Sequence, residues 1–164
     1  DMRPTPEMSF AIRHLGCQSG INITASHNPK EYNGYKAYWD DGAQVLAPHD
    51  KGIIDEVNKV KVEDIKFKGN DALIEIVGED IDKIYLEKVH ELSIDPACIA
   101  RQKDLKIVYT PLHGTGMTLI PASLKLWGFE NVHTVPEQMV KSGDFPTVIS
   151  PNPENGEALT MALK

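Results

Sequence analysis

The chain has 164 residues, of which 41% are hydrophobic and 25% are charged, and its formal net charge is −7. This composition is typical of soluble globular proteins, and the length suits one ordinary domain or parts of two small ones. The negative charge argues against binding to nucleic acid, and no apolar run approaches the roughly 20 residues of a membrane-spanning helix.

A helix is predicted from Thr5-Pro6-Glu7, where a hydroxyl, a proline and an acid occupy the first positions and apolar residues follow at helical spacing. Gly16 is the expected end of this helix. Residues 20–24 then alternate as in a short strand, and a second and third strand, 35–39 and 43–47, flank a hairpin-like turn.

Pro48 is expected to open a second helix, with Ile53, Ile54 and Val57 on one side. Residues 61–78 are less regular, with a short β-like piece at 73–77, and we interpret this region as a domain edge. We therefore expect a first domain at residues 1–62 and a second unit at residues 63–164.

The second unit begins with apolar residues at helical spacing from Ile81 to Leu92, which predicts an amphipathic helix. A strand at 105–110, a helical stretch ending near Gly128 and a strand at 132–135 together predict a βαβ unit with a parallel pair. Residues 136–155 are rich in proline and predict a loop, and a helix is expected from residue 157 onward. The fold class is therefore α/β, with mixed sheets flanked by helices.

Neither cysteine suggests a disulfide or a metal site, because Cys17 and Cys98 lie far apart without a CxxC motif or a Cys/His neighbour. No secretory signal opens the sequence, so we expect a cytoplasmic protein. The sequence begins at Asp1 within a patterned stretch, which suggests a piece of a longer chain.

Ser26 is the first candidate functional residue, since it follows a predicted strand at the position where ligands collect in α/β sheets. Pro29 stiffens the turn, and Asn28 and Asn33 are able to bond to its backbone. A stiff, exposed loop with one hydroxyl suits a phosphorylated nucleophile. The alternative is a serine that only bonds locally within a turn.

His27 and Lys36 supply charge and proton transfer beside this serine, which phosphoryl transfer requires. On spacing alone, ordinary surface residues are the favoured interpretation of both.

Residues 113–116, His-Gly-Thr-Gly, lie between a predicted strand and a helix, where backbone N–H groups favour anions. The motif matches neither GxGxxG nor a nucleotide-binding P-loop, so a tight turn is the alternative to a phosphate contact. Residues 150–156 alternate proline with polar residues and are interpreted as a rigid connector.

The stretch TASHNPKEYNGYK, residues 24–36, resembles the phosphoserine signature of the α-D-phosphohexomutase superfamily, which includes phosphoglucomutases and phosphomannomutases. RPTPEMSFAIR, TPLHGTG and SPNPENGEAL resemble other segments of the same superfamily, in its phosphoglucomutase/phosphopentomutase-like branch. The resemblance implies incomplete pieces of two related α/β domains of a four-domain enzyme.

The resemblance also implies roles for individual residues. Ser26 would carry the phosphate, His27 would be a neighbouring contact and proton-transfer candidate, and Lys36 would be the general acid/base candidate. The expected substrate and phosphate loops contain Thr24, Ala25, Asn28, Asn33, His113 and Gly114.

The family implies Mg²⁺ as the metal, to which Ser26 would offer only a phosphate oxygen, because the aspartate ligands are expected beyond Lys164. It also implies glucose 1,6-bisphosphate as activator and intermediate, and a small sugar phosphate as the binding partner. The expected reaction moves phosphate between C1 and C6 of a hexose phosphate, with glucose phosphates favoured, and this piece alone is expected to be inactive.

Several alternatives stay open at this point. The protein is alternatively a phosphopentomutase, a phosphomannomutase or a glucose-1,6-bisphosphate synthase, or a non-catalytic relative that binds a phosphometabolite or a partner. Surfaces that a longer chain would bury also predict self-association of this chain.

Overall fold

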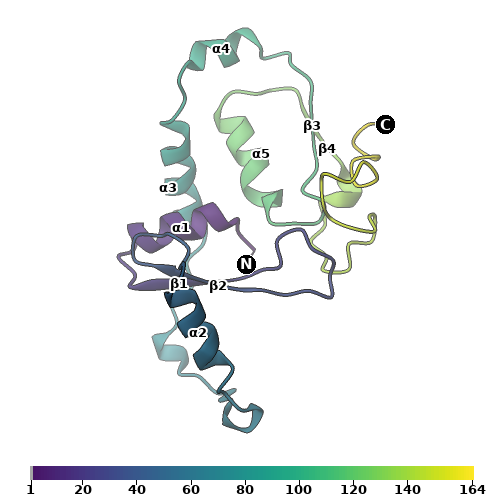
Figure 1. The fold of residues 1–164 in the computed structure, drawn as a ribbon. Coiled ribbons are helices and arrows are strands. Elements are labelled where there is room, and N and C mark those ends of the chain that lie inside the picture. The colour runs from purple at the N-terminus through teal and green to yellow at the C-terminus, as the bar shows by residue number, and fades with distance from the viewer. Residues whose placement is uncertain (1) are drawn as a thin grey trace.

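Two small sheets flanked by helices organise residues 2–164, the part of the chain that the computed structural model describes (Figure 1). The first sheet pairs β1 (Ser19–Ile23) with β2 (Tyr35–Trp39) in antiparallel register. The second pairs β3 (Ile107–Tyr109) with β4 (Val132–Thr134) in parallel. The predicted α/β class with mixed sheets is confirmed.

Helix α1 (Thr5–His14) covers one face of the first sheet, as its apolar spacing predicts. Glu7 lies in its first turn and Gly16 follows its end with a φ of 66°, a backbone conformation that favours glycine. The buried side chain of Ile12 lies against Gly20 of β1, where a side chain would overlap it. This close approach sets the distance between helix and strand.

The predicted third strand, 43–47, is wrong in extent, because only Gln44 forms a bridge, opposite Tyr38. The hairpin turn itself is present, with Trp39 and Ala43 joined by a backbone hydrogen bond of 3.0 Å. The chain then turns away from β2 at residues 47–48 before the next helix begins, so no ladder continues.

Helix α2 (His49–Val57) begins after Pro48 as predicted, but it has no buried residue. Ile54 and Val57 are about half exposed, at 46% and 48%. The apolar side of this helix is therefore uncovered among the described residues, and the expected self-association stays a prediction.

The second unit contains α3 (Glu79–His90), where the periodicity predicted a helix, and α4 (Pro96–Arg101), which the periodicity missed. An N-cap and proline pattern indicates α4, since the Asp95 side chain accepts a hydrogen bond from the Cys98 N–H at 3.1 Å.

The predicted βαβ unit is confirmed, with α5 (Gly116–Leu126) connecting β3 to β4. Helix α3 lies between α1 and α5, so it links the helices of the two sheets (Figure 1). The buried apolar residues come from both sides of this arrangement: Ile12, Tyr38, Val45, Ile81, Leu112, Leu119, Val135 and Ala158.

Two predicted elements are wrong. Residues 73–77 form no strand, and Leu73 and Ile76 are more than four-fifths exposed, because no neighbouring strand offers a partner. Residues 157–164 form turns instead of a helix, and Leu163 is 83% exposed. An amphipathic helix depends on packing of its apolar face, and this face is packed only in part, since Ala158 is buried but Leu159 and Met161 are only half-buried.

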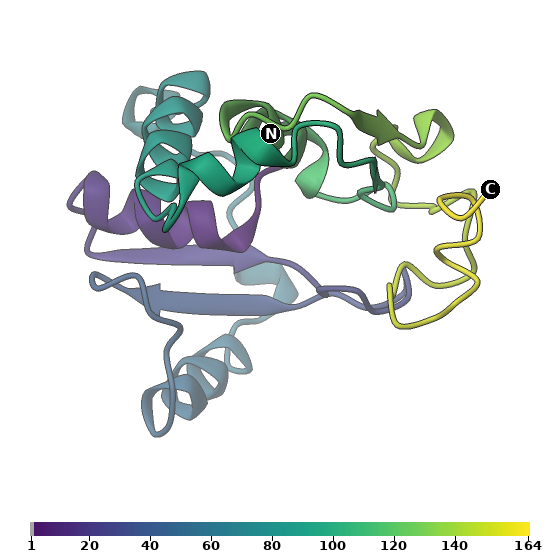
Figure 2. The same cartoon turned by 90° about the horizontal axis from the view of Figure 1, so that it is seen from above.

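Three short 3-10 turns complete the structure, at Val62–Asp64, Asp71–Leu73 and Pro136–Gln138. None of the described helices is long and apolar enough to cross a membrane. Figure 2 shows the loop after β1 reaching away from the first sheet toward the C-terminal segment, which brings the two units together at the candidate site. The expected division at residue 62 stays a prediction.

Candidate functional site

The loop after β1 presents Ser26 in a left-handed backbone conformation, with a φ of 59°. Such a φ is uncommon for a residue other than glycine and occurs often at functional sites. The Ser26 N–H donates to the Thr24 hydroxyl at 3.0 Å, which supports the turn. Asn28 N–H closes a further turn onto the Ala25 carbonyl at 3.1 Å.

The far end of this loop is held beside its start. The Thr24 N–H donates to the Gly34 carbonyl at 3.0 Å, and the Asn33 side chain accepts from the Gly34 N–H at 2.9 Å. A side chain at Gly34 would overlap the Thr24 carbonyl, so the sequence Asn33-Gly34 suits this closure. The Asn33 side chain therefore bonds to the loop backbone as predicted, whereas Asn28 contributes its backbone N–H.

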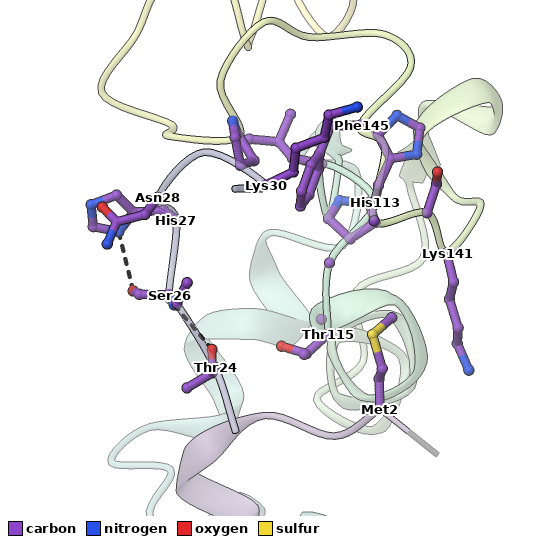
Figure 3. A pocket seen from close by; sticks show the side chains of 18 of the residues that line it. Met2, Thr24, Ser26, His27, Asn28, Lys30, His113, Thr115, Lys141 and Phe145 are labelled. Atoms are coloured by element: carbon purple, nitrogen blue, oxygen red, sulfur yellow. Dashed lines mark hydrogen bonds between the residues drawn. The ribbon is translucent and has the colours of Figure 1, made fainter. Parts of the chain in front are cut away.

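Ser26 and His27 form a pair on the exposed part of the loop (Figure 3). The Ser26 Oγ lies 3.2 Å from the His27 Nδ1, and both side chains are open to solvent. This geometry allows the imidazole to exchange a proton with the serine oxygen.

A cavity of about 1230 Å³ separates this loop from the second unit. The opposite wall comes from two segments: residues 109–116, which follow β3, and residues 141–145, with Phe145 at the end. The remaining lining residues include Met2, Arg3, Thr5, Asn22, Pro151, Pro153 and Leu159. Ser26 and residues 113–116 therefore face the same space, as Figure 3 shows for Ser26, His113 and Thr115.

His113 belongs to this wall, but it is only 1% exposed and its ring is engaged on both nitrogens. Nδ1 lies 2.7 Å from the Val140 carbonyl oxygen, and Nε2 lies 2.9 Å from the Thr147 hydroxyl. Gly114 makes the tight turn beside it, with its N–H donating to the Pro111 carbonyl at 2.8 Å. In this arrangement the His113 ring holds the loop, and a contact between His113 or Gly114 and a phosphate stays a prediction.

Lys36 lies on β2 directly opposite Asn22 of β1. Paired residues of an antiparallel ladder project to the same face, and Asn22 on that face donates to the Thr5 hydroxyl at 2.7 Å and lines the cavity. Lys36 itself is half-buried and is not among the lining residues, so its role in proton transfer stays a prediction.

One ion pair connects the two walls directly. Lys30 Nζ lies 3.2 Å from Asp144 Oδ1, although the two residues are 114 positions apart in the sequence. Sequence reasoning missed this contact and the 141–145 segment. The Lys-Ser-Gly-Asp composition of residues 141–144, in the loop after the βαβ unit, is the signal that indicates a polar turn there.

A buried charged cluster joins α1 to α3 behind the cavity. Arg3 donates to both carboxylate oxygens of Asp82, at 2.6 and 2.7 Å, which lowers the pKa of Asp82. Glu7 lies beside this pair, 3.9 Å from the Arg3 guanidinium, and its carboxyl oxygens lack a hydrogen-bond partner among the described residues. Burial, and then the neighbouring Asp82, raise the pKa of Glu7 to about 7, and Arg3 opposes this rise.

The described residues do not form a magnesium site by themselves. No three side chains of histidine, cysteine, aspartate or glutamate within residues 2–164 are grouped for a metal ion. Mg²⁺ prefers six oxygen ligands, of which a phosphate on Ser26 would supply one. The metal role predicted for Ser26 therefore depends on ligands from outside these residues.

Comparison with known proteins agrees with this geometry. Residues 1–64 match the family model described as phosphoglucomutase/phosphomannomutase, alpha/beta/alpha domain I, and residues 83–164 match domain II of the same family. The chain belongs to the phosphoglucomutase/phosphomannomutase family. The resemblance of residues 24–36 to the phosphohexomutase signature therefore led to the correct family.

Three relatives illustrate the range of this family. The chain is 39% identical to a protein of Schizosaccharomyces pombe named a probable phosphoribomutase, over 98% of this chain and 28% of that protein. It is 40% identical to a phosphoglucomutase of Staphylococcus haemolyticus, over 99% of this chain and 30% of that protein. A crystal structure of a putative phosphomannomutase from Thermus thermophilus superposes with a TM-score of 0.72 and 26% identity, over 98% of this chain and 34% of that one.

The chain thus spans about a third or less of the length of these relatives. The relatives' names place the family among the mutases, a class of isomerases, but they differ in the sugar.

Proposed function

We propose that this chain carries the phosphorylated serine of a phosphosugar mutase, with Ser26 as the nucleophile. The observation that supports this most strongly is the exposed Ser26 hydroxyl on a left-handed turn, 3.2 Å from the His27 Nδ1 and facing a large cavity. Phosphoryl transfer depends mainly on placement and charge, so this serine needs no acyl-transfer triad.

In the proposed reaction, the bond between phosphorus and the Ser26 oxygen breaks while a bond forms to a hydroxyl of the sugar phosphate. The sugar hydroxyl gives up its proton, for which Lys36 is the predicted base, and the serine oxygen regains a proton in exchange with His27. The product is a sugar bisphosphate, glucose 1,6-bisphosphate in the case of glucose. This bisphosphate returns its other phosphate to Ser26, so that 1-phosphate and 6-phosphate interconvert.

We propose glucose 1-phosphate and glucose 6-phosphate as the substrates, with a pentose phosphate as the second candidate. The phosphoglucomutase of Staphylococcus haemolyticus supports the first, and the probable phosphoribomutase of Schizosaccharomyces pombe supports the second. We further propose that the full-length protein requires Mg²⁺, with the missing ligands supplied by residues outside this chain.

The test uses the full-length protein, and mass spectrometry is expected to find phosphate on Ser26. Ser26→Ala is expected to lower the rate of glucose 1-phosphate conversion at least roughly 10³-fold, since the acceptor of the phosphoryl group is lost. Ser19→Ala, at an exposed position on β1, is the matched control. A Ser26→Ala variant that keeps more than about a tenth of the activity would contradict the proposal.

Ribose 1-phosphate, assayed in parallel, decides between the two sugars. A full-length protein that binds either phosphate without converting it would instead favour a non-catalytic relative.

A further inference from the structure

Two loops of the second unit line the cavity opposite Ser26: residues 110–116 and residues 138–147, called here the first and second wall loops. Both contain left-handed residues other than glycine, Leu112 and His113 in the first at 48° and 64°, and Phe145 in the second at 48°. Such conformations persist only where the surrounding structure holds them. The side chains that hold these loops are therefore of functional interest.

The two wall loops are joined by a buried series of polar side chains. The Thr110 hydroxyl donates to the Gln138 Oε1 at 2.6 Å, and the Gln138 Nε2 donates to the Thr147 hydroxyl at 3.1 Å. The Thr147 oxygen also lies 2.9 Å from the His113 Nε2. Gln138 is completely buried and His113 is 1% exposed, whereas Thr110 and Thr147 are half-buried, so these bonds are partly shielded from water.

The Val140 carbonyl accepts only, so the His113 Nδ1 at 2.7 Å must carry a proton. The Thr147 hydroxyl accepts from Gln138 and still has its own proton to donate to the His113 Nε2. With the Gln138 amide in this orientation, a neutral His113 ring protonated on Nδ1 gives each of these contacts a donor and an acceptor.

The reverse direction would need a different histidine. If the Gln138 amide were turned around, its oxygen would take the Thr147 proton and the His113 Nε2 would have to donate to Thr147. His113 would then carry a proton on both nitrogens, because Nδ1 still faces the Val140 carbonyl. A neutral His113 ring protonated on Nδ1 is therefore compatible only with the first direction, in which Thr147 donates to the ring.

We propose that Gln138 and Thr147 are positioning residues, which hold His113 as the Nδ1-protonated tautomer and thereby fix the cavity wall that faces Ser26. Neither residue lines the cavity, so they act through the two wall loops. The wall they support carries residues 113–116, whose backbone leads into the start of α5 and suits an anion. The inference rests on the proposed function in one respect: it takes the anion bound at residues 113–116 to be a sugar phosphate.

The first test is the tautomer in the full-length protein labelled with ¹⁵N-histidine. Long-range ¹H–¹⁵N spectra distinguish the two neutral tautomers from the charged ring, and His113→Gln identifies the signals of His113. We expect a neutral ring protonated on Nδ1. A ring protonated on Nε2, or on both nitrogens, would overturn the proposal, and this measurement needs no variant of Thr147 that folds.

The second test removes the hydroxyl at the centre of the series. Thr147→Val keeps the shape of the side chain but leaves the His113 Nε2 without its donor, so we expect a mixture of tautomers. The affinity for glucose 1-phosphate, measured by calorimetry, is expected to fall about tenfold, which is the effect of roughly 1.4 kcal/mol. Thr147→Ser restores the hydroxyl and is expected to restore both readouts.

Thr134→Val, at an exposed position on β4, is the matched control and is expected to change neither readout. Unchanged tautomer and affinity in Thr147→Val would overturn the proposal, as would failure of Thr147→Ser to rescue, or a wild type that does not bind glucose 1-phosphate. A protein that shows the expected tautomer and affinities, yet carries no phosphate on Ser26 and converts no substrate, would instead refute the proposed function and leave the positioning role standing.

Discussion

The two loops that face each other across the cavity begin with the same type of hydrogen-bonded turn. Each follows the end of a strand, and in each a threonine accepts a hydrogen bond at 3.0 Å from the N–H two residues later, Thr24 from Ser26 and Thr110 from Leu112. In each the residue that donates is left-handed, with φ values of 59° and 48°.

The surroundings of these two turns differ. Ser26 and His27 are exposed, and the Thr24 hydroxyl accepts only within its own turn. Thr110 also donates to the fully buried Gln138, which connects it to a loop far along the chain. The proposed role of Ser26 as a nucleophile requires access to a substrate, whereas the opposite wall gains from being held still. The same turn is therefore exposed in one unit and anchored by a buried side chain in the other.

Removing each threonine hydroxyl tests this contrast directly. Thr110→Val leaves the buried Gln138 oxygen and the Leu112 N–H without partners, so we expect it to lower the free energy of unfolding by about 2–3 kcal/mol. Thr24→Val removes one bond on the surface and is expected to cost about 1 kcal/mol or less. Urea unfolding of the chain measures both, with Thr134→Val as the control. Equal losses of unfolding free energy in Thr24→Val and Thr110→Val would contradict the expected difference between the two loops.

The ionisation of Glu7 is expected to make the stability of the contact between α1 and α3 depend on pH. Its pKa in the folded chain, about 7, lies above the unfolded value of 4.5. The stability that protonated Glu7 contributes is therefore fully present below pH 4.5 and lost as the pH rises through about 7. Asp82 has the opposite sign, since its lowered pKa contributes stability above about pH 3.8 that is lost on further acidification.

Glu7→Gln keeps the shape of the side chain and supplies a permanent donor beside Asp82. We expect it to stabilise the chain relative to the wild type by on the order of 1–3 kcal/mol at pH 8, and by much less at pH 5. Thermal unfolding between pH 5 and 8 measures this difference, and Glu87→Gln, at an exposed position on α3, is the control. A difference that does not grow with pH would contradict the expected ionisation of Glu7.

The ion pair between Lys30 and Asp144 is expected to have the smallest effect. Both side chains are more than half exposed, at 51% and 84%, and exposed ion pairs contribute little. Lys30→Ala is expected to change the free energy of unfolding by less than about 0.5 kcal/mol, and added salt should reduce even that. A cost above about 1 kcal/mol, again from urea unfolding, would show that the Ser26 loop is held as firmly as the opposite wall.

The sequence predicted the exposed side of the site better than the buried side. The Ser26 loop is formed by residues 24–34, so its motif contained the turn, the stiff Pro29 and the closure at Asn33-Gly34. The contact predicted between His113 and a phosphate stays a prediction. The network that holds the His113 ring through Gln138 and Thr147 had no signal in the sequence. The hydrogen bonds of this network join residues 9 to 34 positions apart, which no local pattern records.

The secondary structure shows the same difference between elements that the sequence predicts and segments that depend on tertiary contacts. Helical spacing and local sequence determined α1, α3 and the βαβ unit, because their hydrogen bonds and apolar faces are set by residues close together in the chain. Residues 73–77 and 157–164 have the composition of a strand and a helix, but they take neither form. Residues 73–77 have no partner strand, and of residues 157–164 only Ala158 is fully buried. The sequence by itself determined the family, the loop that carries Ser26 and most of the regular elements. Only the tertiary structure decided which polar residues are buried together, because burial depends on which distant segments meet.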